Sequence, residues 1–148
     1  MIQKYFTKQN LIQIRNACTA AEKTTSGEIR VSILNKRDRS QKDLSIEELA
    51  LQEFHNLKMD ETRDKTGILI FIILKDRQFQ ILADEGINEK VAPDTWQQQA
   101  EVLVDYFKNK KYTEGVTTLI NNMGKILTEH FPIKSDDTNE LPDEVVIR

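Results

Sequence analysis

The stretch ILADEGINEK, residues 81–90, places carboxylates directly after an apolar run. Asp84 and Glu85 precede Gly86 at the point where a predicted strand ends. Carboxylate oxygens are the ligands that Ca²⁺ and Mg²⁺ prefer, but acidic residues at such a position also favour the positive end of a following helix. The sequence has no EF-hand loop pattern. The stretch therefore predicts either a cation site at the rim of a sheet or an ordinary turn.

Few other side chains in the sequence suit catalysis. Cys18 is the single cysteine and shares helical spacing with apolar residues, which predicts a small core residue rather than a nucleophile. His55 and His130 each lie near the end of a predicted helix, where a surface or capping role is common. The segment after the first predicted strand, NKRDRS (35–40), lacks the DxDxT pattern of an aspartate nucleophile. These residues give little support to covalent catalysis.

The hydrophobic pattern indicates the elements that must position these side chains. Helices are predicted at residues 8–23, after Ser45, after Asp94 and around residues 116–126. Thr7, Ser45 and Asp94 are the expected caps of the first three helices. Strands are predicted at EIRVSIL (28–34), GILIFIIL (67–74) and QFQILAD (78–84). The second strand is apolar on both faces, as in a central strand. A right-handed crossover makes the first two strands parallel, and a tight connection makes the last two an antiparallel hairpin. The predicted fold class is α/β, an α/β/α sandwich with a small mixed β-sheet flanked by helices.

This topology brings three loops to one rim of the sheet. The third strand ends beside the start of the second, and the first strand starts there too. Glu28 and Asp84 both lie on the less apolar face of their strands, with Gly67 between them. Their strands lie about 10 Å apart, twice the normal spacing. Two carboxylates that lean inward are expected to reach one cation with oxygens at about 2.4 Å, a distance that suits Ca²⁺.

The composition restricts the class of protein. A chain of 148 residues with a net charge of −3 is not a typical nucleic-acid binder. The longest apolar run, residues 68–74, is too short to span a membrane, and the N-terminus lacks the apolar region of a signal peptide. With a single cysteine, these features predict a cytoplasmic protein. Residues 1–133 are expected to form one α/β/α domain, and residues 134–148 an acidic tail with a short strand at 145–147.

Several segments, in this order, resemble the TPM-domain family: AEKTTSGEIRVSI, LKMDETRDKTGILIFIILKDRQFQILADEGINEKV, KYTEGV, EHFP and NELPDE. The family includes a thylakoid-lumen protein described as an acid phosphatase and a photosystem-repair factor. The resemblance covers about residues 8–148 and is similar in extent to the short, stand-alone bacterial members. It implies an α/β/α sandwich with acidic residues at a sheet-rim site, and calcium has been associated with some members.

The resemblance assigns candidate ligands residue by residue. Glu28 matches the glutamate of the family's SGEI segment, and Asp84 matches the aspartate of its GDxGI segment. Asp143 and Glu144 match a C-terminal acidic pair, which lies either against the same rim or in a solvated tail. With Glu85 beside Asp84, the predicted metal ligands are Glu28, Asp84, Glu85, Asp143 and Glu144.

Two residues depart from the family pattern. Ala83 replaces a common glycine, which reduces the backbone freedom before Asp84. Thr66 stands where many members have asparagine, which removes an amide ligand.

The expected function is binding of a divalent cation, Ca²⁺ with Mg²⁺ as the alternative, by a non-catalytic accessory or interaction module with a protein partner. Hard oxygen ligands without a nucleophile or base suit such a module. The alternative, by resemblance, is a weak metal-dependent acid phosphatase in which Lys65 or Arg63 clamps the phosphate. A third reading is a scaffold whose acidic residues are only turns and caps.

Overall fold

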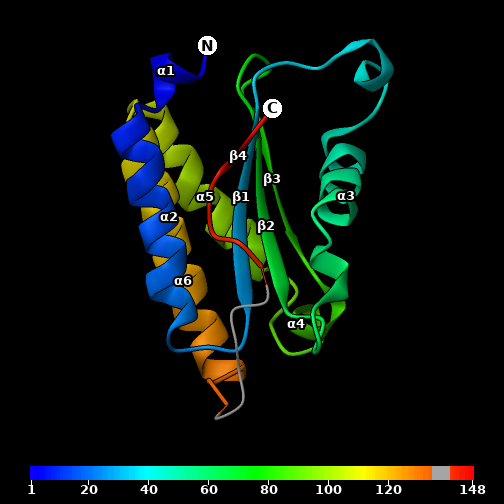
Figure 1. Cartoon of the computed structure of the whole chain (residues 1–148), viewed down its shortest axis with the longest axis vertical. Helices are drawn as coiled ribbons and strands as arrows, with labels where there is room; N and C mark the ends of the chain where they lie inside the picture. Colours follow the sequence, from blue (N-terminus) through cyan, green and yellow to red (C-terminus); the bar gives the residue numbers. More distant parts are fainter. Residues whose placement is uncertain (135–140) are drawn as a thin grey trace.

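The computed structural model describes residues 1–134 and 141–148. Its helices are α1 (Ile2–Tyr5), α2 (Lys8–Glu22), α3 (Ile46–Asn56), α4 (Glu85–Asn88), α5 (Thr95–Lys108) and α6 (Tyr112–His130), with short 3-10 helices η1 (Arg39–Gln41) and η2 (Met59–Glu61). Its strands are β1 (Glu28–Leu34), β2 (Gly67–Ile73), β3 (Gln78–Ala83) and β4 (Val146–Ile147). The sheet lies between α3 on one side and α2, α5 and α6 on the other (Figure 1). The α/β class is therefore confirmed.

The sheet has the order β3-β2-β1-β4. β1 and β2 are parallel, from Glu28 opposite Gly67 to Leu34 opposite Ile73, and β2 and β3 are antiparallel. Both pairings confirm the sequence prediction. β4 adds a fourth strand to the other edge of β1.

β2 is buried along its whole length because both of its faces are covered. Its residues Ile68, Ile70 and Ile72 belong to the core under α2, α5 and α6. Leu69, Phe71 and Ile73 alternate with them and pack in the core under α3. The apolar pattern on both faces of GILIFIIL thus arises, as predicted, from a central strand that is covered on both sides.

The helices begin where the sequence supplies a cap. The side chain of Thr7 accepts a hydrogen bond from the backbone of Asn10, and that of Ser45 accepts one from Glu48, each in a capping box. Asp94 precedes α5 as predicted, but its side chain makes no cap bond and accepts from Gln98 Nε2 instead, at 2.9 Å. None of the helices in the described ranges is both long and apolar enough to cross a membrane.

The three rim loops meet as predicted. Glu28 N donates to Thr66 O at 3.0 Å, and Asp84 N donates to Gly67 O at 2.9 Å. A Cβ atom at Gly86 would lie 2.3 Å from Asp64 O, so only glycine lets α4 pack this closely on the preceding loop.

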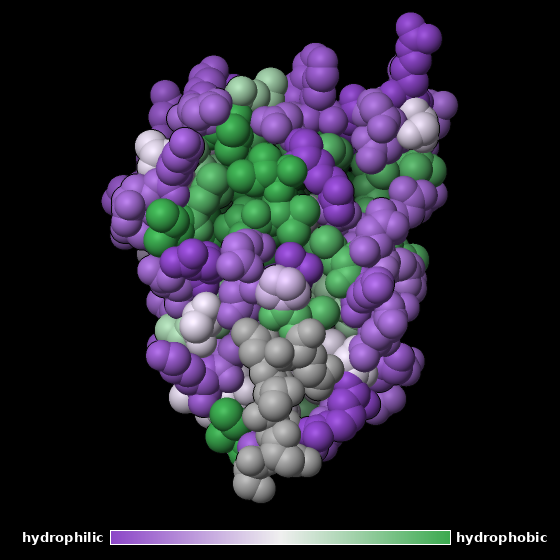
Figure 2. Space-filling view, viewed as in Figure 1, coloured by the Kyte–Doolittle hydropathy of each residue, from purple (hydrophilic) through white to green (hydrophobic). Residues whose placement is uncertain are grey.

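The predicted acidic tail lies partly outside the described residues, and its last eight residues pack on the domain. Val146 and Ile147 pair in parallel with Ser32 and Ile33, rather than forming a solvated tail. Arg148 Nε donates to both carboxylate oxygens of Glu53 on α3, at 2.8 and 3.0 Å. Apolar side chains gather on the surface over β4 and beside α2 (Figure 2), and Ile147 is 43% exposed.

Candidate metal centre

Three carboxylates converge near the start of β1. One oxygen from each of Glu22, Glu28 and Asp143 lies within 4.8 Å of the other two. Glu22 is the last residue of α2, Glu28 is the first residue of β1, and Asp143 precedes β4. The site therefore joins three segments: α2 and β1, which a short connection separates, and the segment before β4, which is distant in sequence.

The end of α2 fixes Glu22. Its Oε2 accepts a hydrogen bond from the backbone of Ile29 at 2.6 Å. Its other oxygen, Oε1, is buried, and no amide, hydroxyl or cationic group of the described residues donates to it. One carboxylate oxygen is thus held by the sheet while the other needs a proton or a cation.

The register of β4 brings Asp143 to the same place. Val146 and Ile147 pair in parallel with Ser32 and Ile33, and Asp143, which precedes this pairing, lies near the start of β1 beside Glu28. Asp143 is 8% exposed, and its Oδ2 accepts a hydrogen bond from Thr19 Oγ1 on α2 at 2.8 Å. Glu28 is 3% exposed. Two of the three carboxylates are therefore nearly removed from water.

Burial and the neighbouring acids change the pKa of Glu22. Burial raises the pKa of its carboxyl group far above the ordinary value, and a hydrogen bond shared with Asp143 and the charge of Glu28 raise it further. The buried thiol of Cys18, one helical turn before Glu22, feels the same field. Its pKa is raised first by burial and then by Glu22 and Asp143, and Arg30 partly opposes this. Without a cation, the cluster favours a shared proton.

The spacing of the oxygens fits a calcium ion. Ca²⁺ binds oxygen at about 2.4 Å, so two ligands on opposite sides of one ion lie about 4.8 Å apart. All three carboxylates can therefore reach the same ion. Ca²⁺ takes six to eight oxygens, so such an ion would also bind water.

Comparisons with known proteins agree with this architecture. Residues 3–126 match the sequence model of the family described as "TPM domain". This chain belongs to the TPM-domain family. A search of the curated proteins finds no match.

Among solved structures, the BA42 protein from the psychrophilic bacterium Bizionia argentinensis is 34% identical to this TPM domain. The match has a TM-score of 0.88 and covers 100% of this chain and 99% of BA42. The N-terminal domain of a protein from P. gingivalis is 14% identical, with a TM-score of 0.69 over 86% of this chain and 79% of that domain. The N-terminal domain of the cg2496 protein from Corynebacterium glutamicum is 11% identical, with a TM-score of 0.63 over 82% and 74%. The last two likenesses show the fold alone.

The TPM domain brings together two of the five predicted ligands, Glu28 and Asp143. Glu85 and Glu144 are exposed and do not belong to the group of three carboxylates. Their assignment as ligands, like that of Glu28 and Asp143, stays a prediction.

Asp84 lies in register with Glu28 and on the same face of the sheet, across Gly67, but it is not part of the group. Two strand spacings, about 10 Å, separate the backbones of Asp84 and Glu28. Asp84 Oδ1 accepts a hydrogen bond from the backbone of Glu85 at 2.8 Å, which makes Asp84 the cap of α4. Its Oδ2 is buried without a partner among the described residues. The structure thus supports the turn reading of this stretch more directly than the ligand reading.

Sequence reasoning missed Glu22, although the pattern contains a signal. Glu22 follows Cys18 by four residues, which places it on the buried stripe of the helix. A glutamate that continues an apolar stripe at the end of a helix needs a partner when it is buried. Residues 28 and 143, which only the folded chain brings near, add two further carboxylates, so the group of three needs a proton or a cation.

Proposed function

We propose that this TPM domain binds one divalent cation, Ca²⁺ in preference to Mg²⁺, through Glu22, Glu28 and Asp143. The observation that carries the proposal is the convergence of three carboxylate oxygens within 4.8 Å of one another at a largely buried position. A cation offsets the burial and the acidic neighbours that otherwise raise the pKa of Glu22. Mg²⁺ requires oxygens at about 2.1 Å and keeps more of its water, so it needs a closer approach of the same side chains.

The role that best fits such a site is that of a non-catalytic accessory or interaction module in the cytoplasm. The cation would tie the end of α2, the start of β1 and the segment before β4 to one another. The exposed Glu144 follows Asp143 directly, so cation binding would also order a surface that a protein partner could meet. Binding to the folded state alone stabilises the fold by mass action.

No contact in the described residues favours the alternative of an acid phosphatase. Cys18 is fully buried, and its thiol pKa is raised, which disfavours the thiolate that a nucleophile needs. The predicted phosphate clamps have other contacts: Lys65 Nζ donates to Asp60 O at 2.6 Å, and Arg63 Nε lies 3.6 Å from Asp64 Oδ2. The phosphatase therefore remains the second candidate by family resemblance only.

Calorimetric titration of Ca²⁺ into the EDTA-treated and desalted protein tests the proposal. Glu22→Gln and Asp143→Asn remove one charge each with little change in shape, and we expect either to weaken Ca²⁺ binding by about tenfold or more. Glu85→Gln and Glu144→Gln make the same chemical change at exposed positions and should bind as the wild type does. Equal losses in all four variants, or no binding by the wild type at millimolar Ca²⁺, would contradict the proposal.

Two further measurements separate the competing readings. Asp84→Asn keeps the cap of α4, because asparagine is as good a cap as aspartate, so Ca²⁺ affinity should fall less than in Asp143→Asn. A larger loss in Asp84→Asn would favour the ligand set read from the sequence. Hydrolysis of a generic phosphomonoester that persists through purification and disappears in Asp143→Asn would favour the phosphatase.

A further inference from the structure

A pocket of about 360 Å³ lies at the end of the molecule opposite the carboxylates. Its lining comes from α1 and the residue after it, the end of β2, the turn into β3, and the region where α5 gives way to α6. Phe6, Ile72 and Ile73 are almost fully buried and form its base. A concave, mostly apolar space of this size is typical of a small-molecule site.

Aromatic rings form the walls of this pocket and support one another. The ring of Tyr112 lies edge-on to that of Tyr5, with centroids 4.9 Å apart, and edge-on to that of Phe107 at 5.5 Å. Phe79 meets Phe107 in the same way at 6.1 Å. Edge-to-face rings attract one another, so the walls are built before any ligand arrives.

Three cations lie at the rim. Arg77, Lys108 and Lys110 line the pocket and are exposed, so they lie on its solvent side. None of the three has an ion-pair partner among the described residues, and no aspartate or glutamate lines the pocket. Because the whole chain carries a net charge of −3, this local excess of positive charge is contrary to the charge of the molecule.

We propose that this pocket binds an amphipathic organic anion, of which a medium-chain monocarboxylate is the simplest case. The apolar tail contacts the aromatic walls and the buried isoleucines, and the anionic head meets Arg77 and the two lysines. A guanidinium group can donate two parallel hydrogen bonds to one carboxylate. Apolar burial supplies the affinity, and the unpaired cations select the sign of the head group.

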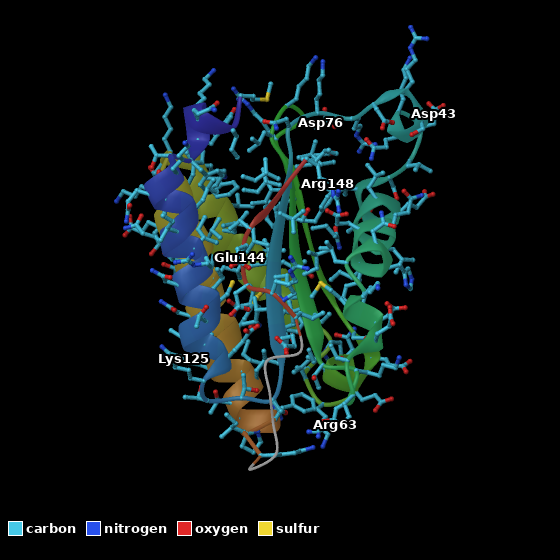
Figure 3. The ribbon with its side chains drawn as sticks, viewed as in Figure 1. Asp43, Arg63, Asp76, Lys125, Glu144 and Arg148 are labelled. Atoms are coloured by element: carbon cyan, nitrogen blue, oxygen red, sulfur yellow. The ribbon has the colours of Figure 1, made fainter. Side chains whose placement is uncertain are left out.

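The pocket is independent of the proposed cation site. β1 and β2 have seven residues each, so the two ends of the sheet lie about 20 Å apart at 3.3 Å per residue. In Figure 3, Asp76, in the turn between β2 and β3, lies at one end of the molecule, and Arg63, in the loop before β2, lies at the opposite end. That distance exceeds the Debye length at physiological salt.

Titration with octanoate, below the concentration at which it forms micelles, tests this proposal. Calorimetry gives the affinity, and the aromatic NMR resonances of the pocket locate the ligand. Octanol and octylamine, with the same tail, are the matched controls for the head group. We expect octanoate to bind with shifts of the Phe79, Phe107 and Tyr112 ring signals, octanol to bind more weakly, and octylamine not to bind. Equal binding of all three ligands, or no octanoate binding at millimolar concentration, would overturn the proposal.

Protein variants separate the roles of charge and cavity. The double variant Arg77→Glu/Lys108→Glu should weaken octanoate binding by about tenfold, a typical effect for two exposed charges. Lys125→Glu is a control for a charge reversal away from the pocket, since Lys125 is exposed on α6 about 20 Å along the helix from Tyr112. Val104→Phe, at a pocket position that is 37% exposed, should fill part of the space and reduce binding without unfolding the protein.

Vesicles distinguish a free anion from a lipid surface. The protein is sedimented with vesicles of phosphatidylglycerol and, separately, of phosphatidylcholine. If octanoate binds and neither kind of vesicle displaces it, the ligand is a free anion. If anionic vesicles displace octanoate, the same pocket binds an anion that belongs to a lipid of the membrane. Binding to anionic vesicles without any octanoate binding would overturn the proposal in favour of a membrane-contacting surface.

Discussion

The carboxyl group of Glu22 lies close to two other carboxyl groups and is largely buried, so its proton is linked to folding. In the unfolded chain this group ionises near its ordinary pKa of 4.5, whereas in the folded chain its pKa is raised by burial and by its acidic neighbours. The folded state then holds more protons than the unfolded state above that pH. Stability must fall as pH rises through this range.

We predict that the midpoint of thermal unfolding in EDTA falls from pH 5 to pH 8, and that Glu22→Gln reduces this fall. One retained proton changes the free energy of unfolding by at most about 1.4 kcal/mol for each pH unit. Thermal melts at constant ionic strength measure the effect. Glu144→Gln, at an exposed acid next to Asp143, should leave the slope unchanged. An unchanged slope in Glu22→Gln would mean that the proton is held elsewhere.

At the scale of elements, polar contacts of Arg148 hold the last strand against both β1 and α3. Glu53 is 4% exposed and accepts hydrogen bonds from the hydroxyl group of Ser32 and from Arg148 Nε. Arg148 N also donates to Ile33 O, and Arg148 O accepts from Asn35 N, both at 2.9 Å. These bonds hold β4 beside β1, and the register of β4 in turn positions Asp143.

We predict that Arg148→Ala lowers the free energy of unfolding by about 1–2 kcal/mol, because it leaves the buried carboxylate of Glu53 with Ser32 alone. The same change should weaken Ca²⁺ binding, since Asp143 loses its support. Urea unfolding and calorimetric titration measure the two effects. In the double variant Glu53→Gln/Arg148→Ala the buried charge is gone, so part of the stability should return while Ca²⁺ affinity stays low. Wild-type Ca²⁺ affinity in Arg148→Ala would show that β4 does not position Asp143.

The same elements show what the sequence could predict. Local patterns were enough for the long elements: the two-sided apolar run of β2 predicted the strand order, and the cap at Thr7 and the capping box at Ser45 predicted two helix starts. The rim followed from topology, since two parallel strands and one hairpin bring residues 28, 67 and 84 into register. Such inferences need only the period of the hydrophobic pattern and the handedness of the crossover.

The candidate site needed contacts that no local pattern contains. β4 has two residues, and its pairing with β1 joins positions more than 100 residues apart. Without that pairing Asp143 cannot be placed, and without Asp143 and Glu28 the glutamate at the end of α2 looks like a solvated residue. Asp84 had the stronger local signal, but its side chain caps α4.

For the whole molecule, a central sheet with two covered faces makes the layers cooperative. β1 and β2 contribute to both cores, so neither α3 nor the α2, α5 and α6 layer can leave without exposing apolar residues of these strands. The proposed cation binds at one rim of this sheet, where the end of α2 and the segment before β4 meet. Its effect should therefore reach the unfolding of the entire chain.

We predict that saturating Ca²⁺ raises the urea midpoint of unfolding without changing the slope, the m value. At a free concentration one hundred times the dissociation constant, the gain is about 2.7 kcal/mol. Far-UV circular dichroism reports all helices, and Trp96 fluorescence reports the contact of α5 with α4, where Trp96 Nε1 donates to Asn88 Oδ1 at 2.8 Å. The two probes should give one transition with and without Ca²⁺.

The m value carries the decisive information because it scales with the surface exposed on unfolding. If Arg148 and β4 already hold the segment before β4 in the metal-free protein, Ca²⁺ adds binding energy but no buried surface. An m value that increases with Ca²⁺ would mean instead that this segment docks only with the cation. Asp143→Asn, which keeps the strand pairing, should show a clearly smaller Ca²⁺-dependent midpoint shift at the same free Ca²⁺ concentration and retain the wild-type m value.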